Sequence, residues 1–303
     1  MFFTAAKKLK SSMLHRTSLS HADINHHLKN VGQTNDDDIS ISETALLIAA
    51  QDRQSNTIDR YRDHLDNLVL QTEDLLIQIK QHKDNLGLND ILNSIETVLY
   101  DINGYKGDTE TYDSLDNANL IAVIERRKGL PIVLGILYLH IIRSLNFKQP
   151  LLAAGLNFPG HFLIRISYEK EHVIIDPFER GKIRDTPWLR ATLKNFLSDQ
   201  AELRAEFTQS VSNRNILLRL QNNIKVRLIQ AEEPEKALEV LEKMLLIAPD
   251  EPAIWHEAGM LQAFLNNILA AIKTLEHYLL IEEDHRGLME ASQMLQKLKA
   301  QLN

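Results

Sequence analysis

The sequence predicts an α+β protein with a helical N-terminal part, a core that contains a small antiparallel sheet, and an all-α C-terminal region. Three observations lead to this prediction. Apolar residues before residue 128 recur at spacings of three and four, which is the period of a helix face. Short runs of strand type follow Pro150, and residues in the C-terminal third repeat at an interval of 34.

The composition bounds the classes of protein and partner. The 303 residues include no cysteine, carry a formal net charge of −7, and are 44% hydrophobic and 25% charged. These values are typical of a soluble globular protein with a core, and we expect a cytoplasmic location. The absence of cysteine excludes disulfides, thiolate metal sites and a cysteine nucleophile. Because nucleic acids and anionic membranes attract positive fields, the negative charge argues against both as partners.

Residues 1–41 are predicted to be a flexible N-terminal extension. The first 22 residues contain basic residues and no acidic residue, which favours a flexible or partly helical segment. Residues 23–42 are polar, and the Asn-Asp-Asp-Asp run at 35–38 is typical of a linker. Ser42 then precedes an apolar run and is a candidate N-cap of the first helix.

Helices are predicted over residues 42–50, 57–82, 88–101 and 117–127, the last of which ends in Arg126-Arg127-Lys128-Gly129. Basic residues and a glycine are common at the C-terminal end of a helix. Pro131 suits the first turn of the next helix, roughly 131–145. Because this helix is apolar on nearly every side, we expect it to be buried all round.

Three strands are predicted, at 151–155, 161–166 and 174–178, and a helix near 187–197 follows them. Side chains alternate along a strand, so His161 faces the same side as Leu163 and Arg165. An even-length loop between the second and third strands places Asp176 on the face of His161, opposite it or one diagonal step away. An odd-length loop places the two side chains on opposite faces.

The C-terminal region repeats with a period of 34 residues. Three pairs of residues are one period apart: Ala237 and Ala271, Leu238 and Ile272, and Leu241 and Leu275. Between them, Pro249, Trp255 and Gly259 stand where a tetratricopeptide repeat has its proline, tryptophan and glycine. Small residues at such positions let two antiparallel helices approach closely. We predict a partial repeat (218–251), a full repeat (252–285) and a final helix (286–301).

Three segments resemble the bacterial SirB family: Glu125–Ile132 with the apolar helix after it, Pro159–Phe162, and Ile175–Phe178. That family is similar to the transglutaminase-like superfamily and carries C-terminal tetratricopeptide repeats. The resemblance covers roughly residues 40–301 and implies a papain-like α+β core, with the buried helix against the sheet. The expected domains are the extension, a transglutaminase-like domain (42–205, with a helical part 42–127 and a core 128–205) and a repeat domain (206–303).

The resemblance also implies where catalytic groups would lie. In active members of the superfamily, a cysteine at the N-terminal end of the buried helix is the nucleophile, and a histidine and an aspartate complete a triad. The cysteine position falls near Pro131 or Ile132, while His161 and Asp176 match the other two. Residues 129–137 contain no serine, threonine or cysteine. Covalent catalysis by this route is therefore excluded.

We expect a non-catalytic protein that acts as a protein-binding, peptide-binding or regulatory scaffold through its repeats and the site around His161. Candidate binding residues are Arg126, Arg127, Pro159, Gly160 and Phe178. The two arginines could instead be a solvated helix end, and His161 a hydrogen-bonded structural residue. The alternative is a hydrolase or transferase that uses His161 and Asp176 as a non-covalent general acid/base pair. No cofactor or metal is expected, and the oligomeric state stays open.

Overall fold

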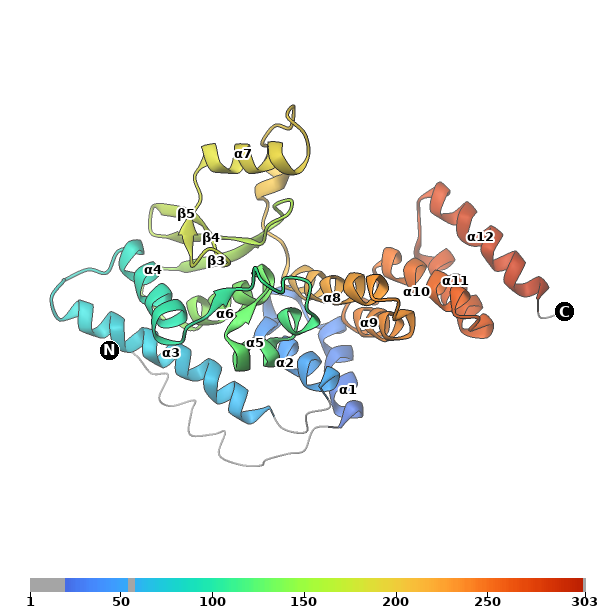
Figure 1. The fold of residues 1–303 in the computed structure, drawn as a ribbon, viewed down its shortest axis with the longest axis horizontal. Coiled ribbons are helices and arrows are strands. Elements are labelled where there is room, and N and C mark those ends of the chain that lie inside the picture. The colour runs from blue at the N-terminus through green and yellow to red at the C-terminus, as the bar shows by residue number, and fades with distance from the viewer. Residues whose placement is uncertain (1–19, 54–57, 302–303) are drawn as a thin grey trace. The chain divides into compact units, whose positions relative to one another are not determined.

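The computed structural model describes residues 20–53 and 58–301 of the chain (Figure 1). These residues form two compact units. The first comprises residues 20–24 and 40–216, and the second comprises residues 25–39 and 217–301. The second unit is therefore built from two separate stretches of chain. Residues 1–19 of the predicted extension lie outside the described residues.

A helix, α1 (His21–Gln33), occupies much of the segment in which the sequence analysis expected a linker. Ile24, Leu28 and Val31 are at most 6% exposed, and their spacing puts them on one face of this helix. Gly32 lies so close to the backbone of Leu246 that no side chain fits between them. The linker prediction is wrong for this segment, because so narrow an apolar stripe does not stand out from its polar surroundings.

The helices in the N-terminal part of the first unit agree with their predicted ranges to within a few residues. They are α2 (Ile41–Asp52), α3 (Asp59–Lys80), α4 (Leu88–Glu96), a π-helical segment (Thr97–Ile102), a 3-10 helix (Leu115–Ala118) and α5 (Leu120–Arg126). Ser42 is not the N-cap of α2, because the helix begins at Ile41 and Ser40 holds the cap position. The Ser42 hydroxyl lies 2.9 Å from Nδ1 of His140 instead.

The helix α6 (Pro131–Ser144) runs through the core of the first unit. Ten of its residues are buried, on every side of the helix, as its all-round apolar sequence predicts. Two short strands, β1 (Lys106–Gly107) and β2 (Lys128–Gly129), pair in parallel just before α6 begins. Pro131 takes the first helical position, where a backbone N–H would have no partner within the helix.

An antiparallel sheet has the strand order β3-β4-β5-β6, with β3 (Leu151–Leu156), β4 (Leu163–Tyr168), β5 (Glu171–Asp176) and β6 (Lys182–Ile183). The small antiparallel sheet is confirmed. Its fourth strand was missed because two residues are too few to show alternation. Tyr168 pairs with Glu171, so the loop between β4 and β5 has an even length. This is the case in which Asp176 shares a face with the odd-numbered residues of β4. The prediction that His161 is part of this strand is wrong, because β4 begins at Leu163.

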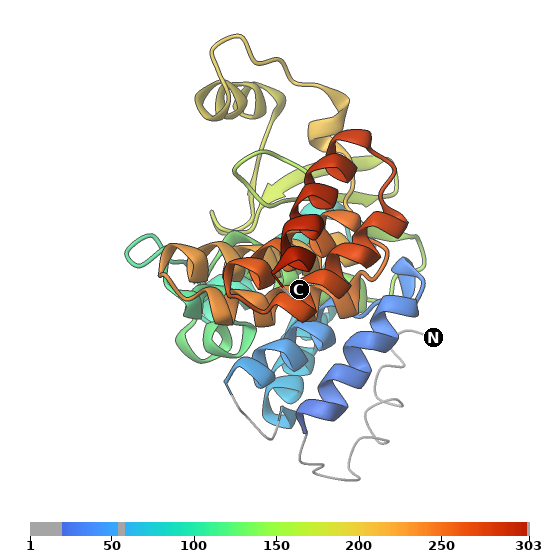
Figure 2. The same ribbon diagram turned by 90° about the vertical axis from the view of Figure 1, so that its right-hand side faces the viewer.

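The sheet lies between α6 and the helix α7 (Thr186–Phe196), as Figure 1 and Figure 2 show. On one face, the Phe162 ring fills the space beside Gly135 of α6. On the other face, Leu163 belongs to one buried cluster with Leu189 and Leu193 of α7. The register of β4 and β5 puts Asp176 on the face of Leu163, the side of α7. His161 lies outside β4, and its ring contacts Trp188 of α7.

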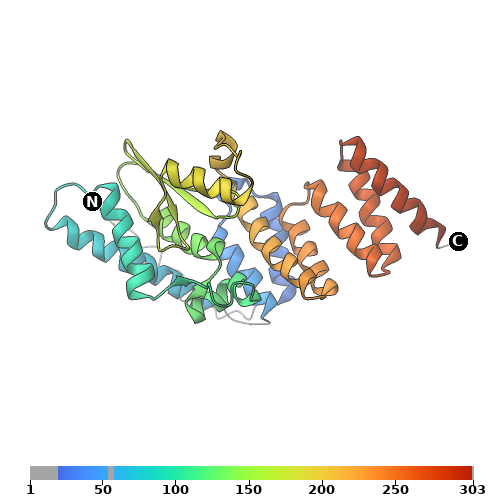
Figure 3. The ribbon, with the colours of Figure 1, turned by 45° about the horizontal axis from the view of Figure 1, so that its top comes forward.

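In the part of the second unit that the structure describes, consecutive helices follow one another (Figure 3): α8 (Asn213–Gln230), α9 (Pro234–Ile247), α10 (Pro252–Phe264), α11 (Ile268–Ile281) and α12 (His285–Ala300). Ala237 and Ala271 have no exposed surface. The Leu275 side chain would overlap a Cβ placed on Gly259. These close contacts confirm the helix pairs that the period of 34 predicted. None of the helices among residues 20–53 and 58–301 is long and apolar enough to cross a membrane.

Candidate functional site

His161 lies in a tight turn between β3 and β4. Its backbone N–H donates to the carbonyl of Phe158 at 3.4 Å. Gly160 has a φ of +73°, a conformation that strains residues with a side chain. The Phe196 ring of α7 lies against Gly160 and leaves no room for a Cβ there. The predicted binding residues Pro159 and Gly160 thus form the turn that positions His161.

Asp176 is the last residue of β5 and is only 1% exposed. Its Oδ1 accepts hydrogen bonds from the backbone N–H groups of Phe178, at 3.1 Å, and Glu179, at 3.4 Å. Its Oδ2 lies 3.8 Å from Nδ1 of His161. The structure therefore brings the two predicted residues together. Their distance is longer than a hydrogen bond between nitrogen and oxygen, which is about 2.7–3.2 Å.

Arg184 is a close ionic partner of Asp176 that the sequence analysis missed. Its Nη2 donates to Oδ2 of Asp176 at 2.8 Å, and its Nε donates to the same oxygen at 3.3 Å. The backbone N–H of Arg184 donates to the carbonyl of Ile174 at 2.8 Å, which continues the pairing of β5 with β6. No local motif marks this pair, because it depends on the register of a two-residue strand.

Aromatic rings surround the His161 imidazole. The ring centroids of Trp188 and Phe158 lie 5.3 Å and 6.2 Å from that of His161, both in edge-to-face geometry. The Arg184 guanidinium lies 4.0 Å from the centroid of the Trp188 ring, which is a cation–π contact. The His161 side chain is 35% exposed. A ligand can therefore reach part of the imidazole within a frame of aromatic rings and paired charges.

The nucleophile position that the resemblance implies lies at the start of α6. Ile132 is 2% exposed and points an aliphatic side chain into the core. Gly129, just before α6, pairs with Gly107. The Phe178 ring lies directly against Gly107, so it connects the turn after β5 to this end of α6. A proline and an isoleucine carry no side-chain atom that can attack a carbonyl group.

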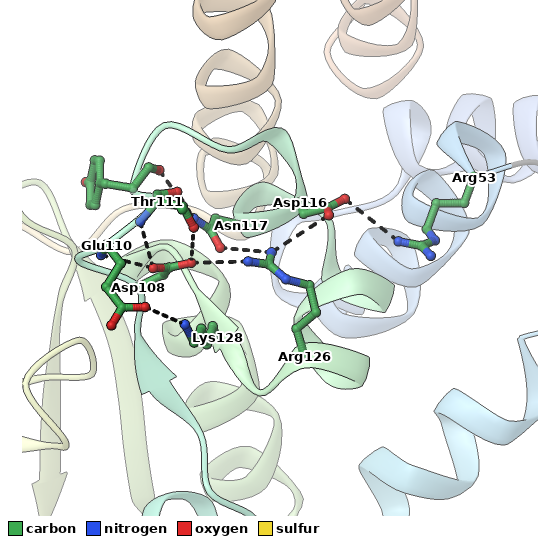
Figure 4. A network of polar contacts seen from close by, with 9 residues as sticks. Arg53, Asp108, Glu110, Thr111, Asp116, Asn117, Arg126 and Lys128 are labelled. Carbon is green, nitrogen blue, oxygen red and sulfur yellow. Dashed lines mark hydrogen bonds and ion pairs between the residues drawn. The ribbon is translucent and has the colours of Figure 1, made fainter.

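Arg126 belongs to a network of polar groups around Asp108 (Figure 4). Asp108 is 2% exposed and accepts hydrogen bonds from the N–H and hydroxyl of Thr111, at 3.0 and 2.7 Å, and from Arg126 at 3.2 Å. Thr111, above all, holds the pKa of Asp108 well below its usual range. Arg126 also donates to Oδ1 of Asn117 at 3.1 Å, and the Asn117 carbonyl accepts from the N–H of Leu130. The network fixes the loop that leads into α6.

Arg127 has a different set of partners. It follows α5 with a φ of 60°, and its guanidinium lies 4.7 Å from the centroid of the Tyr105 ring. It donates to the Tyr105 hydroxyl and, at 2.6 Å, to Nε2 of His64. Burial first, and the Arg127 charge second, lowers the pKa of His64 to about 4. Both arginines thus have partners inside the first unit, and their role in binding stays a prediction.

A half-buried carboxylate, Glu96, lies against the turn that follows Asp176. Its Oε1 contacts Gly181 so closely that no Cβ would fit there. Burial raises the pKa of Glu96 to about 7, although the Arg180 charge opposes the shift. The hydroxyl of Tyr100 donates to the carbonyl of Pro177 at 2.9 Å. These residues, from α4 and the π-helical segment, support the turn.

Comparison with protein families gives two matches along the chain. Residues 59–222 match the transglutaminase-like superfamily, and residues 224–302 match the tetratricopeptide repeat. The first match includes His161, Asp176 and the start of α6. The second match covers the helices for which the sequence predicted a 34-residue period.

The chain is also similar to several bacterial proteins. It is 26% identical over 259 residues to a UPF0162 protein of Xylella fastidiosa, which is 82% of this chain and 86% of that protein. It is 30% identical over 177 residues to a UPF0162 protein of Vibrio cholerae, which is 58% of this chain and 64% of that protein. It is 27% identical over 217 residues to protein SirB1 of Salmonella typhimurium, which is 71% of this chain and 77% of that protein. No solved structure shows significant similarity to the chain.

Proposed function

Because the chain belongs to the transglutaminase-like superfamily and carries tetratricopeptide repeats, as its SirB-type motifs predicted, we propose that it is a non-catalytic member that binds a protein or peptide partner. The observation that carries this proposal is the first turn of α6. A proline and a buried isoleucine stand where the nucleophile of active members is expected. The protein would then act as a scaffold, with its repeats and the His161 site as binding surfaces.

The bonds of Asp176 support this proposal. In a triad, the carboxylate accepts a hydrogen bond from the histidine and so orients the imidazole. Here Oδ2 of Asp176 lies 1.0 Å nearer to Arg184 than to His161, at 2.8 against 3.8 Å. Asp176 thus has a closer partner than His161, as expected for a site that no longer needs the aspartate to orient the imidazole.

The repeats support a role in binding. Tetratricopeptide repeats stack into extended surfaces that proteins use to bind other proteins. Phe264 is 77% exposed and Leu269 is 65% exposed, on the two sides of the turn between α10 and α11. Contiguous exposed apolar surface is typical of interaction sites, and these two side chains are our candidates for such a surface.

The test compares full-length variants that are purified from the native cell together with their bound proteins. We expect Leu269→Ala to reduce capture of a partner about tenfold, the effect of one well-buried contact in an interface. The matched control is Leu152→Ala, because Leu152 is also exposed, at 64%, but lies in the first unit. It should leave capture unchanged.

The same purification tests the enzymatic alternative through the mass of the captured partner. The proposal expects an unaltered partner from both the wild type and His161→Ala. Recovery of a cleaved or modified partner from the wild type, and of an intact one from folded His161→Ala, would establish the hydrolase or transferase instead.

A further inference from the structure

We propose that Arg184 is the positioning residue of the His161 site: it holds the carboxylate of Asp176 and keeps it from acting as the partner of the imidazole. This inference deepens the proposed function, because it names the residue that separates the histidine from the aspartate. It rests on the contacts of Arg184, Asp176 and Trp188, and its test does not depend on a known partner.

The hydrogen bonds of Asp176 leave little capacity for His161. A carboxylate accepts about four hydrogen bonds through its two oxygens. Backbone N–H groups of Phe178 and Glu179 bind Oδ1, and two guanidinium nitrogens of Arg184 bind Oδ2. The carboxylate is 1% exposed and the Arg184 side chain 7%, so water competes weakly for either group. The pair is thus complete without the imidazole.

Arg184 is itself fixed in place from two directions. Its backbone continues the pairing of β6 with β5 through Ile174. Its guanidinium stacks on the Trp188 ring. Trp188 is held in turn by the start of α7, where its N–H donates to Oδ1 of Asp185, the N-cap, at 2.9 Å. The same Trp188 ring contacts the edge of His161. One side chain therefore sets the distance between the guanidinium and the imidazole.

Electrostatics follow from this arrangement. Two charged groups of this arrangement lie near His161: the Asp176 carboxylate, 3.8 Å from its Nδ1, and the Arg184 guanidinium bound to that carboxylate. The rings of Phe158 and Trp188 are uncharged. Because the ion pair is neutral as a whole, it attracts a proton to the imidazole far less than a free carboxylate would. Loss of the arginine charge would leave a free carboxylate at this distance. A free carboxylate this close typically shifts the pKa of a neighbouring cationic group upward by about 1–3 units.

The experiment follows the ring signals of His161 by NMR in the full chain, across a pH titration, with His161→Gln to assign them. We expect Arg184→Gln to raise the pH midpoint of these signals by about one unit or more. The double variant Asp176→Asn/Arg184→Gln should return the midpoint to within a few tenths of the wild-type value. The control is Arg180→Gln, because Arg180 pairs with Asp101 and stacks on Tyr100. It should leave the midpoint unchanged.

An unchanged midpoint in folded Arg184→Gln overturns the proposal, since a purely structural arginine would not affect the titration of His161. If Arg184→Gln does not fold, Arg184→Met decides. Methionine removes the charge and keeps an unbranched side chain against Trp188, so the midpoint should still rise, and an unchanged midpoint again overturns the proposal. A negative result in this titration would refute the role of Arg184 and would not decide whether the protein is an enzyme. Turnover that depends on His161 would refute the proposed function whatever the midpoint does.

Discussion

Two buried aspartates in the first unit, Asp108 and Asp176, have the same environment in outline and differ in their neighbours. Each is at most 2% exposed, and each accepts backbone N–H bonds on one side and an arginine on the other. Asp108 closes a loop by bonds to Thr111 and Arg126. Asp176 does the same for a turn, but a histidine lies 3.8 Å from it. A buried aspartate beside an arginine thus stabilises loops here in general, and the histidine alone marks the second site as a candidate functional site.

The largest loss of stability is expected when Asp108 is replaced. Asp108→Asn replaces a carboxylate, which only accepts hydrogen bonds, by an amide whose NH2 group cannot accept from Thr111 or Arg126. It also leaves Arg126 without its buried counter-charge. We expect a loss of about 3–5 kcal/mol in the free energy of unfolding, measured by urea denaturation. The control is Asp116→Asn, whose side chain is 55% exposed and lies 4.0 Å from Arg126. It should cost about 0.5 kcal/mol or less, and an equal loss in both variants would contradict the role of burial.

Acid should weaken the same loop. The folded state holds the pKa of Asp108 well below the ordinary value of 3.8. The unfolded chain therefore binds a proton that the folded chain does not, and stability is lost as the pH falls below about 4. This loss is bounded by the cost of Asp108→Asn. Unfolding measured between pH 5 and pH 2.5 should be less steep with pH in Asp108→Asn than in the wild type, and equal slopes would refute the assignment.

The two arginines should differ in their contribution to stability. The Arg184 side chain is 7% exposed and that of Arg126 is 31% exposed. Arg184→Gln removes both bonds of Oδ2 in Asp176, whereas Asp108 keeps its bonds from Thr111 when Arg126 is replaced. We expect a loss of about 2–3 kcal/mol for Arg184→Gln and about 1 kcal/mol for Arg126→Gln by the same denaturation. The reverse order would overturn the comparison.

Glu96 is the contrasting case, in which burial outweighs the attraction of a cation. Its pKa is raised from 4.5 to about 7, so the folded state keeps a proton that the unfolded state loses. This contribution is complete below about pH 4.5 and falls as the pH rises to about 7. With Glu96 half exposed, we expect about 1 kcal/mol over this range. Thermal unfolding of Glu96→Gln should lack this decline, while Glu179→Gln, at an exposed site in the turn that Glu96 contacts, should keep it.

Much of the fold could be predicted because it follows from the spacing of apolar residues, the 34-residue repeat and the even length of one loop. The all-round apolar sequence of 131–145 indicated a buried helix, and α6 is that helix. The even-length loop between β4 and β5 decided that Asp176 shares a face with Leu163, the first residue of β4, two residues after His161. The period of 34 indicated the paired helices through Ala237 and Ala271. Each of these depends on residues close in sequence or on a simple repeat.

The rest depends on contacts that no local pattern encodes. Arg184 reaches Asp176 only through a two-residue strand, whose length is too short for a detectable alternation. The contact of Arg126 with Asp108 could not be predicted, because Asp108 lies 18 residues earlier in a polar loop. The helix α1 escaped detection because its apolar stripe is narrow, and because its close contact, between Gly32 and the backbone of Leu246, is with a residue far along the chain.

The packing of Gly32 against Leu246 also bears on how the chain is made. About 210 residues separate the two positions, and the whole of the first unit from residue 40 onward is synthesised between them. At roughly 5–20 residues per second, Leu246 is synthesised about 10–40 s after Gly32. The first unit can therefore complete its sheet during synthesis, while the N-terminal helix joins the second unit only near the end of translation. A nascent chain stalled before residue 246 would leave Gly32 without this contact, and α1 could then be bound by a chaperone.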